Sequence, residues 1–159
     1  MIDILFEVPL PPRGKDRPRV TRTGHAYTPA ATRKWEATLG MMAQEQMPKE
    51  VLDQPLRVDV LAVLPRPKRL LRKSDPDGLI WAPTKPDMDN IIKATLDALK
   101  AFWRDDAVVV DVSGVKVYAE RAGRPRMVVR IRSAEQTEAR VKACFERFDA
   151  EISKGESHG

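Results

Sequence analysis

The chain has 159 residues, 42% of them hydrophobic and 32% charged, which is the composition of a soluble globular domain with one hydrophobic core. The formal net charge is +5, and the single cysteine, Cys144, excludes a disulfide framework within one chain. No apolar run approaches the length of a membrane span and no secretory signal stands at the N-terminus, so we expect a cytoplasmic protein without a membrane partner.

The first half of the chain alternates between regular elements and long loops. Hydrophobic periodicity predicts, in order, a strand, a helix and a strand over residues 2–8, 29–46 and 56–64. Two long loops, residues 13–28 and 65–86, are rich in proline and charge. Loops of this length inside a compact domain are commonly functional or mobile.

The second half of the chain predicts a helix, several strands and a last helix. In order these are helix 89–102, strands 107–112, 115–120 and 126–132, and helix 134–150. Residues 107–112 are nearly all apolar, which indicates a strand buried on both faces, and the tail, residues 151–159, is expected to fray. Strands mixed with helices and no visible domain boundary predict one α+β domain over residues 1–150.

Two basic clusters fall in the two long loops. Lysine and arginine in loops suit contacts to a phosphate backbone, which supply most sequence-independent affinity for nucleic acid. A solvated cationic surface kept for solubility is the alternative that charge alone leaves open. The candidate DNA-binding residues are Arg13, Lys15, Arg17, Arg19 and Arg22 in the first loop and Lys68, Arg69 and Arg72 in the second.

Two aspartates, Asp87 and Asp89, stand at the start of the helix predicted over residues 89–102. In an extended backbone, residues two apart project to the same side. Mg²⁺ binds one or two carboxylates in proteins, together with water and substrate phosphate. A third acid from the far end of the helix, Asp105 or Asp106, would complete such a site. This pattern favours a metal-dependent enzyme that acts on a polyanion.

The same residues also have structural interpretations as helix caps, exposed ion pairs and turn residues. Lys93, one turn from Asp89, would balance that acid, hold an attacking water or stabilise charge on a phosphate. From the residues alone, a metal site and a set of caps and turns are both open. The residues with such an alternative are Asp89, Asn90, Lys93, Asp97, Asp105 and Asp106.

A long motif covers these acids. Lys-Pro-Asp-x-Asp-Asn-x-x-Lys-x-x-x-Asp-Ala-Leu occupies residues 85–99, and an aromatic-x-Asp-Asp sequence and a valine-rich strand follow it. With these motifs, an N-terminal strand that ends in Pro-Pro and a basic loop after it, the chain resembles the RusA family of Holliday junction resolvases over nearly its whole length. The resemblance implies a mixed β-sheet packed with two to three helices.

The resemblance also implies an activity. In that family three aspartates bind Mg²⁺, and the matching residues here are Asp87, Asp89 and Asp106, while the functional lysine matches Lys93. It implies a homodimeric endonuclease that resolves four-way DNA junctions by paired symmetric nicks, in DNA recombination and repair. Mn²⁺ is expected to substitute for Mg²⁺, and no small-molecule cofactor is expected. Asp97 and Asp105 match acidic positions of the pattern and are expected to be supporting or structural.

Three departures from the family pattern put the substrate in doubt. The spacer between Asp97 and Asp105 is short, the loop 65–86 is long, and the helix predicted over residues 134–150 is an addition. Two other functions stay open: a protein that binds DNA structures without cleaving them, in which the acids serve as caps and turns, and a nuclease that acts on forks, flaps or RNA. Trp81, beside the second loop, is expected to pack rather than to stack on a base.

Overall fold

The protein is described from a computed structural model, in which residues 1–134 and 142–143 are described. A five-stranded sheet forms its centre, with strand order β1-β7-β4-β6-β5. β4 and β6 are parallel, whereas β1 with β7, β7 with β4, and β6 with β5 are antiparallel, so the sheet is mixed. The strands are β1 (Asp3–Val8), β4 (Leu56–Leu64), β5 (Ile80–Trp81), β6 (Val109–Tyr118) and β7 (Arg126–Ser133).

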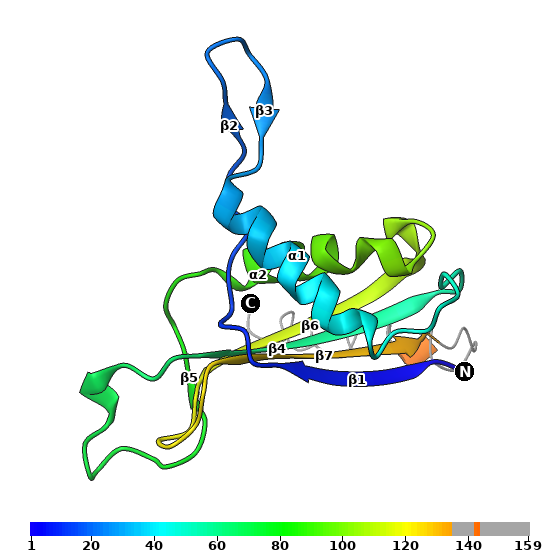
Figure 1. Ribbon diagram of the computed structural model, residues 1–159. Coiled ribbons are helices and arrows are strands. Elements are labelled where there is room, and N and C mark those ends of the chain that lie inside the picture. The colour runs from blue at the N-terminus through cyan, green and yellow to red at the C-terminus, as the bar shows by residue number, and fades with distance from the viewer. Residues whose placement is uncertain (135–141, 144–159) are drawn as a thin grey trace, which may run out of the picture.

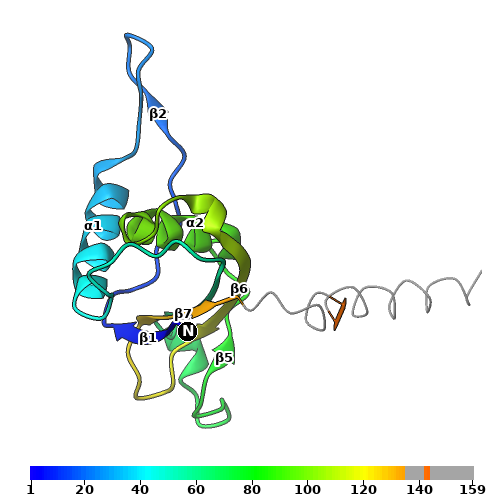
Figure 2. The same ribbon diagram turned by 90° about the vertical axis from the view of Figure 1, so that its right-hand side faces the viewer.

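Two helices, α1 (Ala30–Gln44) and α2 (Met88–Leu99), cover one face of the sheet (Figures 1 and 2). A short 3₁₀ turn, Lys100–Phe102, extends α2. The predicted α+β fold is confirmed, as are the strands and helices expected over residues 2–8, 29–46, 56–64 and 126–132. The predicted helix 134–150 and tail lie outside the described residues, apart from residues 134, 142 and 143.

The core lies between the helices and the sheet. Its fully buried side chains come from both layers, and examples are Leu39 in α1, Ile91 and Leu99 in α2, Val58 in β4 and Ile131 in β7. Burying side chains of this size stabilises the fold by roughly 1.5–3 kcal/mol each. None of the helices in the described part of the chain is long and apolar enough to cross a membrane.

One strand prediction is wrong in its boundaries and in its burial. The strands expected over residues 107–112 and 115–120 are a single strand, β6, which a 3₁₀ turn at Asp106–Val108 precedes. Val110 in this strand is 61% exposed rather than buried. The reason is that β5 has two residues and pairs only with Val117 and Tyr118, so the start of β6 lies at the edge of the sheet.

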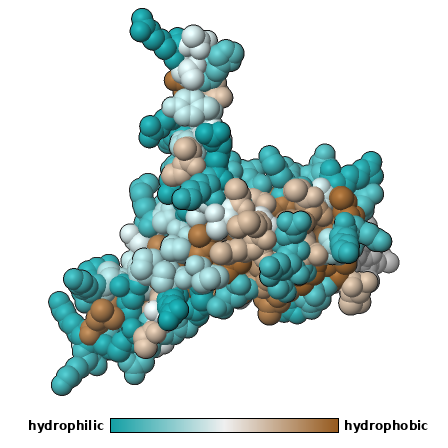
Figure 3. Space-filling view, viewed as in Figure 1, coloured by the Kyte–Doolittle hydropathy of each residue, from teal (hydrophilic) through white to brown (hydrophobic). Residues whose placement is uncertain are grey.

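Both long loops contain short elements that periodicity does not reveal. In the first, β2 (Arg19–Val20) and β3 (Ala26–Tyr27) form a small antiparallel hairpin that projects from the body of the molecule (Figure 1). In the second, a 3₁₀ turn at Lys68–Leu70 is followed by β5. Both projections are largely hydrophilic (Figure 3). They therefore contribute surface rather than core.

Gly40 tests the contact between α1 and α2. A Cβ at this position would lie 2.8 Å from the backbone carbonyl oxygen of Ala98, which cannot move aside without moving α2. Overpacking of this kind costs about 1–3 kcal/mol, against a gain in helix propensity of about 1 kcal/mol. We expect Gly40→Ala to lower the free energy of unfolding in urea. Gly78→Ala is the matched control, because a Cβ at Gly78 meets no atom within 4 Å.

Glu120 provides a test of stability against pH. The Arg126 guanidinium donates hydrogen bonds of 2.8 and 2.9 Å to its carboxylate and lowers the pKa of Glu120 to about 2. A carboxyl with a lowered pKa stabilises the fold above its unfolded pKa of about 4.3, and this stabilisation is lost as the pH falls through the folded value. We expect Glu120→Gln to flatten the loss of thermal stability between about pH 4.5 and pH 2.

The control for this prediction is Glu7→Gln. Glu7 lies 3.5 Å from the same guanidinium and its side chain is 61% exposed, so its removal should leave the acid profile nearly unchanged. An equal flattening by both substitutions would show that the Arg126–Glu120 pair is not responsible.

Candidate functional site

The acid pair lies at the N-terminus of α2. Asp87 is the N-cap residue, with an extended backbone (φ −69°, ψ 144°), and Asp89 is in the first turn. The Asp87 side chain forms no capping hydrogen bond, so its carboxylate is not engaged by the helix N-terminus. The two side chains are 56% and 65% exposed, and both are therefore accessible to a ligand.

A lysine stands beside each acid. The Lys93 Nζ is 3.6 Å from the Asp89 Oδ2, and the Lys85 Nζ is 3.5 Å from the Asp87 Oδ2. All four side chains are more than half exposed, and exposed pairs of this kind contribute about 0–1 kcal/mol. They are loose enough to exchange partners, so the acids can turn toward a cation and the lysines toward a phosphate.

The predicted third ligand is not brought to this pair. Asp106 follows the other end of α2, where its Oδ1 accepts a hydrogen bond of 3.1 Å from the Trp103 indole. Asp105 caps the next 3₁₀ turn by accepting a hydrogen bond of 2.7 Å from the Ala107 amide. Among residues 1–134 and 142–143, no group of three or more His, Cys, Asp or Glu side chains lies close enough together to hold a metal ion.

The donors that are brought together nonetheless suit a hard divalent cation. Mg²⁺ is usually bound through one or two carboxylates and keeps several waters that a substrate phosphate can replace. Asp87 and Asp89 supply two carboxylates on exposed side chains at a helix start. These two residues could hold the ion, whereas the structure adds no third protein ligand among the described residues.

Lys116, which the sequence analysis did not single out, reaches the segment in front of Asp87. Its Nζ donates a hydrogen bond of 2.8 Å to the Pro86 carbonyl oxygen and a second one to the Thr84 carbonyl oxygen. One sequence signal was available: a lysine in the middle of an apolar strand, flanked by Val115 and Val117.

The start of the first basic loop packs on the other side of this segment. A Cβ placed on Gly14 would lie 2.9 Å from the Cβ of Pro86, so only glycine permits this close approach. The Lys15 amide donates a hydrogen bond of 2.8 Å to the Asn90 carbonyl oxygen. The loop thereby touches the first turn of α2.

Two residues of the first basic cluster are engaged by acids: Lys15 joins the loop to both helices, and Arg13 pairs with an acid of the loop itself. The Lys15 Nζ lies 2.7 Å from both Glu36 in α1 and Asp97 in α2. Burial alone would lower the pKa of Lys15, but the hydrogen bonds with Asp97 and Glu36 outweigh it and raise the pKa above its usual value. Arg13 donates a 2.8 Å hydrogen bond to Asp16. These contacts give Arg13, Lys15 and Asp97 a structural role.

The other three arginines of the first cluster are exposed. Arg17 precedes the β2–β3 hairpin, Arg19 lies in β2 and Arg22 lies at its tip. The turn closes through Gly24, whose φ of 85° is a conformation that side chains other than glycine rarely adopt. The hairpin therefore presents these three guanidinium groups to solvent.

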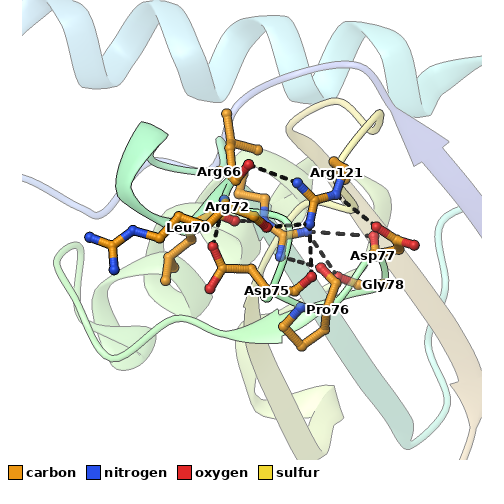
Figure 4. Close-up of polar contacts among 9 residues, drawn as sticks. Arg66, Leu70, Arg72, Asp75, Pro76, Asp77, Gly78 and Arg121 are labelled. Atoms are coloured by element: carbon orange, nitrogen blue, oxygen red, sulfur yellow. Dashed lines mark hydrogen bonds and ion pairs between the residues drawn. The ribbon is translucent and has the colours of Figure 1, made fainter.

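Two arginines fix the shape of the second basic loop from inside (Figure 4). Arg66 donates hydrogen bonds to the carbonyl oxygens of Leu70 and Gly78, at 2.8 and 3.3 Å. Arg121, from the β6–β7 connection, donates to the carbonyl oxygens of Leu71, Arg72 and Asp75 and to the Asp77 carboxylate, all at 2.7–2.8 Å. Lys68, Arg69 and Arg72 are exposed on this loop.

The two projections extend in different directions from the body of the molecule. In Figure 1 the β2–β3 hairpin extends from one side of the molecule and the second basic loop from the other, and the segment that leads from β5 to α2 runs between them. Trp81 in β5 is 72% exposed, so the expectation of a packing role for it is wrong.

A mixed sheet with an acid pair at a helix start, together with basic projections, is the arrangement expected of a nuclease related to RusA. Residues 9–132 match the family model described as Endodeoxyribonuclease RusA. The chain belongs to this family of endodeoxyribonucleases, which confirms the predicted resemblance. The chain is also similar to a Bacillus subtilis (strain 168) protein described as Uncharacterized protein YqaN. The two are 33% identical over 138 residues, which cover 81% of this chain and 95% of the relative.

The role of Arg121 leads to a prediction about the second basic loop. Arg121→Lys keeps the charge but removes the planar fork that bonds several groups at once. We expect faster limited proteolysis within residues 66–78, with little change in the melting temperature because the loop lies outside the core. Arg124→Lys, an exposed residue of the same connection, is the control. Equal protease resistance of Arg121→Lys and the wild type would show that Arg121 does not hold the loop.

Proposed function

We propose that the protein is a Mg²⁺-dependent endodeoxyribonuclease that resolves four-way DNA junctions by paired symmetric nicks, in DNA recombination and repair. The observation that carries the proposal is the exposed acid pair Asp87 and Asp89 beside Lys93, in a chain that belongs to a family of endodeoxyribonucleases. The basic projections support DNA as the substrate.

The proposed metal ligands are Asp87, Asp89 and Asp106. The geometry supports the first two, and Asp106 is kept on the family resemblance alone. A bound Mg²⁺, or Mn²⁺ in its place, would lower the pKa of a water and polarise the scissile phosphate. Lys93 would stabilise negative charge on the phosphate or orient the attacking water, because its ammonium lies within 3.6 Å of Asp89.

Contacts within the protein reduce the set of basic residues that we propose to contact DNA. Arg13 and Lys15 are engaged by acids within the protein, which favours a supporting role for both. The exposed basic residues remain as candidate phosphate contacts, and contacts of this kind fix position rather than base sequence. Trp81 is exposed enough to stack on an unpaired base. The proposed contacts are Arg17, Arg19, Arg22, Lys68, Arg69 and Arg72.

A homodimer is part of the proposal. A four-way junction has two equivalent strands to cut, and a two-fold dimer presents two identical sites at a fixed separation. Paired symmetric nicks would follow from this symmetry, because each site would cut one of the two strands.

Cleavage of a labelled four-way junction in Mg²⁺ tests the proposal. We expect the wild type to introduce paired nicks and Asp87→Asn to reduce their rate by roughly 10³-fold, because metal-ion stabilisation of the transition state is worth several kcal/mol. Asp3→Asn is the matched control. Asp3 lies in the edge strand β1, and its side chain is 49% exposed and also pairs with a basic residue, Arg130.

The substrate controls separate the alternatives. Linear duplex, a Y-fork and an RNA junction are assayed at the same salt concentration, since salt governs the affinity of basic surfaces for nucleic acid. Preferred cutting of forks or RNA would show that the protein is a nuclease for another substrate rather than a junction resolvase. If the wild type binds the junction tightly but shows no metal-dependent cutting, the protein is a DNA-structure-binding protein rather than an enzyme.

A further inference from the structure

Lys116 connects the sheet to the segment that carries Asp87. Its Nζ donates hydrogen bonds to the carbonyl oxygens of Thr84 and Pro86, the latter at 2.8 Å. Its own backbone carbonyl accepts a hydrogen bond of 3.3 Å from the Ala82 amide. The segment is thus held to Lys116 at three points within five residues, and the last of them is directly before Asp87.

Strand geometry directs Lys116 toward α2. Residues two apart in a strand project to the same face, so Gly114, Lys116 and Tyr118 share one face of β6. A Cβ at Gly114 would lie 2.9 Å from the Ile92 Cδ1, so this face is the one on which the start of α2 packs. Tyr118 on the same face is buried in the core. Lys116 therefore lies on the face of β6 that packs against the start of α2, where the acid pair is.

The partners of Lys116 are neutral. Its ammonium donates to two carbonyl oxygens, and in residues 1–134 no carboxylate is recorded within 4.0 Å of it. Lys85 and Lys93, in contrast, each stand beside one acid of the pair. Lys116 differs from these lysines because its contacts are with the backbone that leads to Asp87 rather than with a carboxylate.

The backbone at this point determines the geometry of the acid pair. Asp87 is extended, just outside the helix, while Asp89 is within the first turn. The separation and direction of their carboxylates depend on how the chain enters the helix, and a carbonyl fixed at Pro86 fixes that entry. Two carboxylates bind a cation well only if they are held in a defined arrangement.

We propose that Lys116 is a positioning residue of the acid site: by fixing the carbonyl oxygens of Thr84 and Pro86, it sets the arrangement in which Asp87 and Asp89 bind a divalent cation. The inference rests on the proposed function for its effect on DNA cleavage. Its effects on the backbone and on cation binding do not depend on which DNA is cut.

The test compares full-length wild type, Lys116→Met and Lys116→Arg, with Lys49→Met as an exposed control lysine remote in sequence from the site. The first readout is Mn²⁺ binding, followed by the electron paramagnetic resonance signal of the free ion. Removing a nearby positive charge alone would strengthen Mn²⁺ binding. Loss of positioning would weaken it, by roughly 10-fold, as for residues that orient metal ligands. The sign of the change therefore separates the two effects.

The second readout is amide hydrogen exchange in residues 82–92. We expect faster exchange in Lys116→Met, a nearly normal rate in Lys116→Arg, which keeps the charge and the donors, and no change in Lys49→Met. In junction cleavage, Lys116→Met should lower kcat with little change in KM, because the DNA-binding projections are untouched. If Lys116→Met does not fold, Lys116→Gln takes its place in each measurement.

Unchanged or tighter Mn²⁺ binding by Lys116→Met, together with unchanged exchange, would overturn the inference. A wild type that binds Mn²⁺ but cuts no DNA would contradict the proposed nuclease function. The binding and exchange measurements would still decide the role of Lys116. If the wild type binds no Mn²⁺, the exchange measurement decides whether Lys116 holds the segment, and unchanged exchange in that case also overturns the inference.

Discussion

The parallel pairing of β4 with β6 is the constraint on which the rest of the structure depends. Parallel neighbours cannot be joined by a tight turn and need a long crossover, usually with a helix. Here the crossover contains the second basic loop, β5 and α2, so one topological requirement supplies both a projecting basic surface and a helix N-terminus above the sheet. The acid pair lies where the crossover enters that helix. The site is thus a product of the connection between two strands, and the sheet holds it through Gly114 and Lys116.

The described basic residues in and around the two long loops fall into two groups by their contacts. Arg66, Arg121 and Lys116 donate to backbone carbonyl oxygens, and Lys15 bridges acids of α1 and α2. These cations stabilise irregular segments that have too few apolar side chains to pack. The exposed basic residues lie on the segments that this first group fixes. A count of cationic residues from the composition cannot separate the two groups, because both consist of lysine and arginine.

Much of the fold, and the central part of the site, could be predicted from the sequence. Periodicity gave α1, α2, β1, β4 and β7, and the motif over residues 85–99 placed the acid pair at a helix start. Tertiary contacts decided the rest. The apolar run at the start of β6 is exposed because its edge lacks a full neighbour, and Lys15 is engaged because Glu36 and Asp97 meet around it. Asp106 follows the other end of α2, and its carboxylate accepts a hydrogen bond from the Trp103 indole, a contact that the motif alone does not reveal.

The β2–β3 hairpin has a consequence for how such a protein can diversify. Each of its residues from Arg19 to Tyr27 is exposed, so substitutions there change few core contacts and are close to neutral for stability. Insertions and charge changes in this hairpin can therefore accumulate without unfolding the domain. Under the proposed function, DNA affinity would change in evolution at this one hairpin, while the sheet, the two helices and the acid pair stay as they are.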